Sequence, residues 1–349
     1  MSTDWRRAAR LWAVVLVFAG IGVARSVQVG IPFRDPGGDF LARRIVVTAG
    51  VFAALVVVDG LLRTPRPWTR TDVAATIRTR WPAGRLALAA SALLAYLLTY
   101  FTYHNLKSWD VLNAPRDAML LRWDRWLLAG HSPAVLLHEL LGTHVAAWVL
   151  MVWYETFPSL VVVGFPAAVA LARRTRDAYA GIAALVWVWI LGTATYYAIP
   201  SLGPFHAAPQ EFAGLPHMPI QDTQARYLAQ RDHLLAHPHA ADAFAQISAF
   251  ASLHVGVTAT LLGLAWWHRL RRTTIVLAVF LAGTMVATVY LGWHFAVDVP
   301  AGLAIAAAAW WLGPRTVGVR RPTPVVPDEM VVEQALSRPF RPVRRWARR

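Results

Sequence analysis

The segment Tyr290-Leu-Gly-Trp-His-Phe-Ala-Val-Asp298 lies between two apolar runs, at the point where one ends and the next begins. His294 and Asp298 are four residues apart, so on a helix they share one face, and the carboxylate can hydrogen-bond to the imidazole ring. Earlier in the chain, Ala251-Ser-Leu-His254 places a second histidine in another apolar run. Titratable groups at the ends of membrane helices are costly and usually functional. The two segments therefore predict one site built from neighbouring spans.

The composition around these segments is typical of a helical membrane protein. Of 349 residues, 57% are hydrophobic and only 15% are charged, whereas a soluble domain carries more charge. Cysteine is absent, which excludes disulfides, iron–sulfur ligation and a cysteine nucleophile. The net charge of +15 is carried by arginines grouped between apolar runs and in the tail, a positive-inside pattern, so we expect no nucleic-acid partner.

The apolar runs predict an all-α, polytopic protein with about eight transmembrane helices, because about 20 apolar residues cross a bilayer. We expect two of these helices and a basic cytoplasmic loop in residues 1–85, a six-helix catalytic core in residues 86–312, and a disordered, Arg/Pro-rich cytoplasmic tail in residues 313–349. The runs are Leu11–Val23, Ile45–Leu62, Leu86–Tyr103, Val145–Leu171, Tyr179–Ile199, Ile247–Trp267, Thr274–Leu291 and Phe295–Leu312.

The arginine clusters set the expected orientation. They follow every second run, which places both termini in the cytoplasm and His254, His294 and Asp298 at the external face. Leu11–Val23 also has the pattern of a signal peptide, and the count is seven if this run does not cross. The first external loop departs from the rule, because it holds four arginines: Arg25, Arg34, Arg43 and Arg44.

One external connection, residues 104–144, has a pattern of its own. Asp110, Asp117 and Asp124 recur at seven-residue intervals among Leu and Trp. This spacing predicts an amphipathic helix that lies in the membrane interface.

The two histidine segments also resemble a known family. Ser252-Leu-His254 followed by Tyr290-Leu-Gly-Trp-His-x-x-x-Asp298 resembles the second and third motifs of the type 2 phosphatidic acid phosphatase (PAP2) superfamily, and is most similar to its inositol phosphorylceramide synthase-like branch. The resemblance covers residues 90–312. It implies that His294 forms a phosphohistidine, that Asp298 orients it, and that His254 is the acid and base, with no metal or other cofactor.

The sequence departs from the phosphatase pattern at the phosphate-binding residues. The first motif, Lys followed by Arg-Pro, is missing, because no Arg-Pro follows Lys107, the only lysine, at the required spacing. The Ser-Arg that opens the third motif is replaced by Ala287 and Thr288. The resemblance makes Tyr196–Pro204 the counterpart of the first motif. Candidates for binding the substrate are Ser252, Tyr197, Arg226, Arg231 and Glu155, the last placed near mid-bilayer, with Arg116, Arg122 and Arg125 as further cations.

These features predict an enzyme of the bacterial cytoplasmic membrane that acts on a phospholipid or lipid phosphate. By resemblance, it transfers a phosphoinositol-type headgroup to a lipid hydroxyl, or releases it to water. Three alternatives stay open: a lipid phosphate or prenyl-diphosphate phosphatase with the same His, His and Asp, a proton-coupled transporter, and a metal-dependent hydrolase. The oligomeric state is not indicated. Five histidines in one loop match no standard zinc-ligand spacing, so we expect no metal site: His206, His217, His233, His237 and His239.

Overall fold

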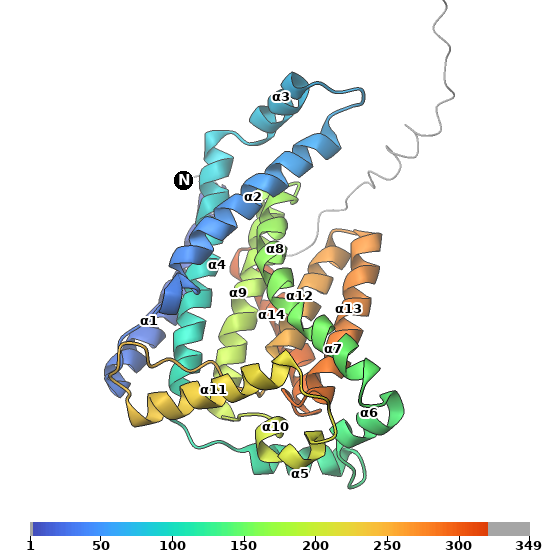
Figure 1. Ribbon diagram of the computed structural model, residues 1–349. Coiled ribbons are helices and arrows are strands. Elements are labelled where there is room, and N and C mark those ends of the chain that lie inside the picture. The colour runs from blue at the N-terminus through green and yellow to red at the C-terminus, as the bar shows by residue number, and fades with distance from the viewer. Residues whose placement is uncertain (1–2, 320–349) are drawn as a thin grey trace, which may run out of the picture.

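The computed structural model describes residues 3–319, and within this range every regular element is a helix. The predicted all-α, polytopic membrane architecture is confirmed (Figure 1). Six helical segments of the described range are long and apolar enough to cross a bilayer: α1 (Thr3–Val29), Pro36–Arg63 with α2 (Ala42–Arg63), α4 (Ala83–Asp110), Val145–Ala170 with α7 (Val145–Glu155) and α8 (Phe157–Ala170), α9 (Thr175–Ala198) and α13 (Arg271–Tyr290).

Six such segments are fewer than the eight expected, and the difference lies in the last part of the bundle. The predicted run 247–267 becomes a helix only in α12 (Leu253–Trp267), of 15 residues, because Ala249 and Phe250 donate their backbone N–H groups to Ser201 and remain in a loop. The predicted run 295–312 becomes α14 (Asp298–Thr316), which is not among the six. Both helices nevertheless pack inside the bundle, against α9 and each other.

The centre of the bundle is α9, which packs against α4, α8, α12 and α14. Small residues permit this closeness, as is usual between membrane helices. A Cβ at Gly313 of α14 would lie 2.4 Å from the backbone nitrogen of Ala184 in α9. This contact also shows that α14 continues past residue 312 into the segment predicted as tail; the rest of that segment, from residue 320, lies outside the described residues.

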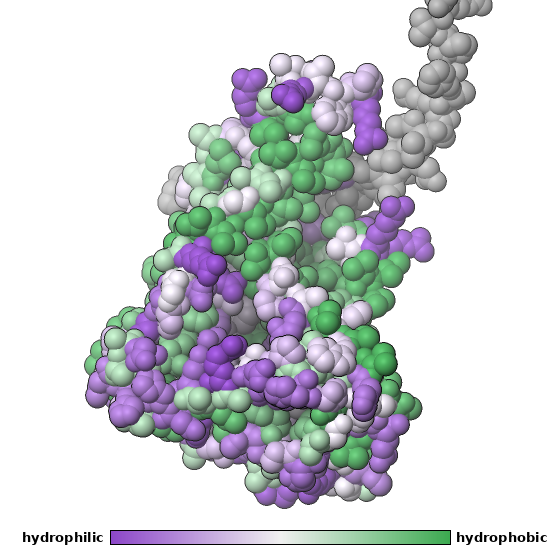
Figure 2. Space-filling model, viewed as in Figure 1, coloured by the Kyte–Doolittle hydropathy of each residue, from purple (hydrophilic) through white to green (hydrophobic). Residues whose placement is uncertain are grey.

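The N-terminal helices join the same bundle, since α1 packs on α4 and α9, and α2 packs on α8. At one end of the molecule lie the chain start, α3 (Arg70–Arg80) and the turn between α12 and α13. The opposite end is covered by α5 (Asp117–Leu127), α6 (Pro133–Leu141), α10 (Pro204–Ala207) and α11 (Pro219–Ala236), with a short 3-10 helix, η2 (Pro209–Phe212). Figure 2 shows apolar side chains over the middle of the bundle and polar ones at both ends.

Candidate active site

A tight turn connects α13 to α14 and carries the first predicted histidine. Gly292 lies in this turn with φ +77°, a conformation that glycine adopts without strain. A Cβ at this position would lie 2.8 Å from the ring of Phe212 and 2.9 Å from Phe205. The turn can therefore be this tight, and this closely covered, only with glycine at its centre.

Side chains from the covering helices fix the backbone of this turn on one side. The carbonyl groups of residues 290, 291 and 292 accept hydrogen bonds from the Nε2 of His138, the Nε2 of Gln224 and the backbone N–H of Phe205, each at 2.9 Å. These donors come from α6, α11 and α10, respectively. Three separate elements thus hold a turn that two membrane helices alone would leave free.

Asp124 of α5 fixes the other side of the turn. Its buried carboxylate accepts the backbone N–H groups of Ala296 at 2.8 Å and of Val297 at 2.9 Å. Burial raises the pKa of Asp124 to about 6, although these two hydrogen bonds act in the opposite direction. The residues that Asp124 holds are those between His294 and Asp298, so it sets the spacing of that pair.

The three evenly spaced aspartates thus do not lie on one amphipathic helix, as the sequence predicted. Asp110 ends α4, whereas Asp117 and Asp124 belong to α5. Asp117 accepts the N–H groups of residues 202 and 203 at 2.9 and 3.0 Å, and burial raises its pKa against the effect of those bonds. Asp110 accepts hydrogen bonds from Asn113 and Ser248. All three carboxylates hold loops at the same end of the bundle.

His294 and Asp298 make the hydrogen bond that their spacing predicts. The Nδ1 of His294 lies 3.0 Å from Oδ2 of Asp298, which is fully buried. Because a carboxylate can only accept, Nδ1 carries the proton, and Nε2 carries the lone pair. That Nε2 lies 3.4 Å from Nδ1 of His254. The structure therefore brings the three predicted residues together.

His254 is the second residue of α12, and aromatic rings hold its imidazole in place. Tyr154 stacks on it with ring centroids 4.5 Å apart, and Phe157 lies 4.2 Å away on the other side of the break between α7 and α8. Ser252 caps α12, because its hydroxyl accepts the N–H of Val255. Ser252 is fully buried and does not line the cavity described below, so the structure assigns it to the start of the helix rather than to the substrate.

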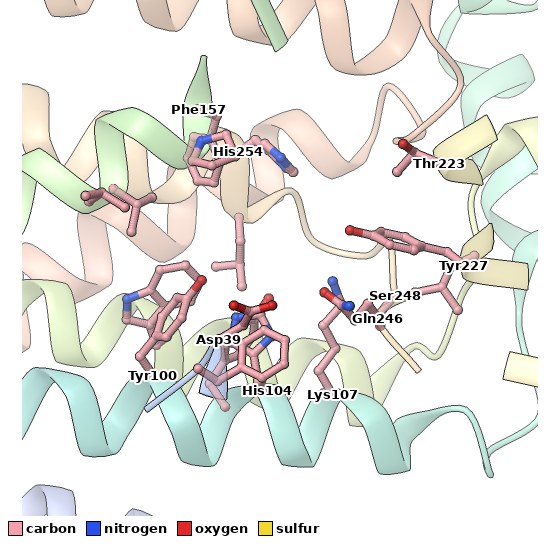
Figure 3. Close-up of a pocket in the computed structure, with 18 of the residues that line it drawn as sticks. Asp39, Tyr100, His104, Lys107, Phe157, Thr223, Tyr227, Gln246, Ser248 and His254 are labelled. Atoms are coloured by element: carbon pink, nitrogen blue, oxygen red, sulfur yellow. The ribbon is translucent and has the colours of Figure 1, made fainter. Parts of the chain in front are cut away.

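A cavity of about 600 Å³ opens in front of the two histidines. Its lining comes from α2, α4, α7, α8, α9, α11 and α12. Figure 3 shows His254 and Phe157 on one wall and Tyr100, His104 and Lys107 of α4 on the opposite wall. The lining is mixed, with apolar side chains from α8 and polar ones from the loops.

Comparison with protein families matches residues 118–312, more than half of the chain, to the PAP2 superfamily. The chain belongs to the PAP2 superfamily. Membership, together with six membrane-length helices, indicates a lipid phosphatase or phosphotransferase. No curated protein and no solved structure matches the chain. The matched range includes His254, His294, Asp298 and Asp124, and it begins after Lys107.

The remaining substrate-binding candidates of this PAP2 protein divide into two groups. Arg226 and Glu155 line the cavity. Glu155 does not lie in the middle of a continuous helix, as its position in the apolar run had suggested, but ends α7 at the break before α8. Tyr197 and Arg231 do not line the cavity: the Tyr197 hydroxyl donates to the carbonyl of residue 106 at 2.8 Å, and Arg231 is 3.4 Å from Asp232.

The interfacial arginines proposed from sequence do not line the cavity in front of the histidines: Arg116, Arg122 and Arg125. Arg125 instead lines a second, small pocket that His294 also lines, and it forms an ion pair with Glu211 at 3.2 Å. Within residues 3–319, no group of three or more His, Asp or Glu side chains is placed to hold a metal ion.

Besides Arg226, three cations line the cavity that sequence reasoning missed: Arg43, Arg44 and Lys107. A signal for the two arginines was present, because they break the positive-inside rule in the loop that the sequence predicts to be external. Arg34 of the same loop donates to the carbonyl groups of Ala243 and Pro238. Arginines on the side where the rule expects few therefore mark structural and cavity contacts. Lys107 had no comparable signal, because a single lysine at a helix end is commonplace.

Proposed function

We propose that this PAP2 protein transfers a phosphoryl or phosphodiester group of a membrane lipid through a phosphohistidine on His294. One observation carries the proposal: a histidine with its Nδ1 bonded to a buried carboxylate at 3.0 Å, and its Nε2 beside a second histidine, lines a cavity in a bundle of membrane-length helices. Such a pair makes a nucleophile, since the carboxylate fixes the tautomer and stabilises the imidazolium that forms.

In the first step, Nε2 of His294 attacks the phosphorus atom and forms a P–N bond, while the bond from phosphorus to the leaving oxygen breaks. His254, in its protonated form, gives its proton to that oxygen. Asp298 stabilises the positive charge that develops on the ring of His294. The hold of Asp124 on the backbone between these residues keeps the pair at its working distance.

In the second step, His254 takes a proton from the acceptor hydroxyl, whose oxygen attacks phosphorus as the P–N bond breaks. A lipid hydroxyl as acceptor gives a transferase, and water gives a phosphatase. We favour transfer of a phosphoinositol-type headgroup to a lipid hydroxyl, on the likeness of the two histidine segments to the inositol phosphorylceramide synthase-like branch. Hydrolysis of a lipid phosphate or prenyl diphosphate by the same residues is the second candidate, supported by the superfamily match.

The proposed site faces the outside of the bacterial cytoplasmic membrane. Basic side chains of α3 and of the junctions before α9 and α13 lie at the end of the bundle opposite α5, α6, α10 and α11, which favours a cytoplasmic location for that basic end. The same placement argues against a proton-coupled transporter, because transport sites lie near the bilayer midplane, whereas His294 lies in a terminal turn.

The test uses the purified full-length protein in lipid nanodiscs that contain radiolabelled phospholipids and lipid phosphates. Both released phosphate and transferred headgroup are followed, for the wild type and for His294→Ala. We expect at least a thousandfold loss in the variant, which lacks the nucleophile. Headgroup transfer in the wild type supports the synthase, and phosphate release alone supports the phosphatase. Unchanged turnover in His294→Ala would falsify the phosphohistidine mechanism.

A further inference from the structure

The cavity carries more positive charge than its catalytic residues explain. Four basic side chains line it, Arg43, Arg44, Lys107 and Arg226, against two acidic ones, Asp39 and Glu155. Three of the four basic residues precede the range matched to the PAP2 superfamily. They come from the start of α2 and the end of α4. Figure 3 shows Lys107 on the wall opposite His254, together with Tyr100, on which Arg44 packs, and Asp39, with which Arg43 pairs.

Lys107 is the centre of this charge. Within the described residues its ammonium group has no ion pair within 4.0 Å, and its nearest aromatic face is the ring of Tyr196, 5.8 Å away. Asp110, one turn further along α4, acts electrostatically on Lys107 from beyond ion-pair distance and also accepts hydrogen bonds from Asn113 and Ser248. An ammonium group that lines a cavity without a direct ion pair is only partly compensated, so an anion bound in the cavity would stabilise it.

The neighbours of Lys107 are fixed in place by protein contacts. The guanidinium of Arg44 lies 4.5 Å from the ring centre of Tyr100, and its Nε donates to the carbonyl of Asp39 at 3.0 Å. Arg43 is 3.2 Å from the Asp39 carboxylate, so its charge is partly compensated. His104 lies three residues before Lys107 on α4 and against the ring of Tyr100, and its two ring nitrogens are buried without a partner in the described part of the chain. This wall therefore offers oriented donors and an excess of positive charge.

We propose that Lys107 and Arg44 form a second anion subsite, which binds a phosphoryl group of the substrate other than the one that His294 attacks. The proposal rests on the proposed function of the cavity. Because the two cations lie across the cavity from the histidines, a single phosphoryl group at His294 leaves them unneutralised. The substrate class is then a lipid with two phosphoryl groups, either adjacent in a diphosphate or separated on a headgroup. Charge complementarity selects it over a lipid monophosphate.

The test measures binding rather than turnover. Full-length protein in detergent is titrated by calorimetry with methylphosphonate, methylenediphosphonate and propanediol bisphosphate. For the wild type, we expect one of the two doubly charged ligands to bind about tenfold or more tightly than methylphosphonate, since a charge-assisted hydrogen bond to a buried cation is worth about this factor. Preference for methylenediphosphonate indicates adjacent phosphoryl groups, and preference for propanediol bisphosphate indicates separated ones.

Two variants and one control locate the subsite. Lys107→Met and Arg44→Gln should each reduce the preference for the doubly charged ligand to about threefold or less and leave methylphosphonate affinity unchanged. Arg272→Gln, which removes one charge from an exposed position at the start of α13, should bind like the wild type.

If Lys107→Met weakens the binding of all three ligands by the same factor, Lys107 contacts the attacked phosphoryl group and the proposal of a second subsite is wrong. Equal affinities in the wild type also overturn it. Neither result depends on whether His294→Ala retains turnover, so the failure of this proposal and that of the proposed function are distinguishable.

Discussion

The two walls of the cavity are built in different ways. On the wall of the histidines, the backbone of the turn between α13 and α14 is held by His138, Gln224 and Asp124, although Nε1 of Trp293 and Oδ1 of Asp298 are buried there without a partner in the described residues. On the opposite wall, Lys107 has no ion pair within the described residues, and the nitrogens of His104 have no hydrogen bond. The first wall lies inside the range matched to the superfamily and the second outside it.

This difference suggests that the first wall positions the catalytic residues and that the second wall recognises the charge of the substrate. Chemistry on phosphorus needs atoms held within fractions of an ångström, and the backbone that carries His294 is fixed by hydrogen bonds before substrate arrives. Recognition of a charged group needs donors that remain free until it binds. Substitutions on the first wall should therefore reduce the rate of the chemical step, and substitutions on the second should change which substrate is accepted.

The largest effect is expected from His254→Gln, which keeps a polar side chain on the first wall but removes the acid and base. Loss of proton transfer should reduce kcat by about 10²- to 10⁴-fold. Rapid-quench trapping of phosphohistidine on His294 is the informative measurement, with an activated leaving group that needs no proton. Restored trapping with that substrate confirms the role in proton transfer, and a continued absence of trapping shows that His254 is needed only for the fold of the site.

Asp124→Asn tests whether the first wall works through positioning. Asn offers one oxygen where the carboxylate accepts two N–H groups, so one of the bonds to Ala296 and Val297 is lost. A hydrogen bond to a charged group contributes about 1.5–3 kcal/mol, which predicts a loss in kcat of about 10- to 100-fold with little change in KM. Asp232→Asn, on an exposed face of α11, is the matched control. A rise in KM with unchanged kcat would place Asp124 in substrate binding instead.

The comparison of the wild type with Asp124→Asn also predicts opposite effects of acid on the stability of the protein and on its turnover. Burial raises the pKa of Asp124 to about 6, whereas an aspartate in the unfolded chain has a pKa of about 3.9. Between these values the native state holds a proton that the unfolded state releases, so the contribution of Asp124 to stability increases as pH falls from about 6 to about 4. Thermal unfolding at pH 5 and pH 7.5 should show the wild type gaining stability relative to Asp124→Asn at the lower pH. The turnover advantage of the wild type should shrink over the same interval, because the protonated carboxyl accepts fewer N–H groups. A constant difference in melting temperature contradicts the assignment of the raised pKa.

Arg226→Gln and Arg231→Gln compare an arginine that lines the cavity with one that does not, on the same helix, α11. Arg226 lines the cavity and Arg231 does not. We expect kcat/KM to fall about three- to tenfold for Arg226→Gln and less than about twofold for Arg231→Gln, since Arg231 lies outside the cavity and pairs with Asp232. Equal losses for the two variants contradict the boundary of the cavity on α11.

The smallest effect is expected from metal removal. The mechanism uses only side chains of the chain, so EDTA should leave turnover unchanged, whereas vanadate, which imitates the transferred phosphoryl group, should inhibit it. Loss of activity in EDTA that Mg²⁺ or Zn²⁺ restores favours the metal-dependent hydrolase.

The sequence predicted those site residues whose partners lie only a few positions away in the chain. His294 and Asp298 lie one helical turn apart, and His254 follows a serine that caps its helix, so short spacings were enough to find them. The choice of Tyr197 over Tyr196 shows the limit. Successive residues on a helix point about 100° apart, and only the packing of α9 against α4 decides which of the two faces the cavity.

Residues that act across the bundle could not be found in this way. Lys107 reaches the site because α4 packs beside α9, and Asp124 because α5 folds back under α14; neither contact leaves a pattern in the local sequence. Eight predicted spans became six long ones for a related reason, because loop contacts to Ser201 kept residues 249–250 out of α12. Tertiary contacts decided each of these features.

The cavity is walled in part by α2 and α8, two helices whose other faces carry exposed valines, among them Val46 and Val163. An enzyme with such a wall meets its lipid substrate by diffusion in the plane of the bilayer. The concentration that governs its rate is then the mole fraction of substrate in one leaflet. Diluting the substrate lipid with an inert lipid slows such an enzyme, whereas diluting the membranes themselves in buffer does not.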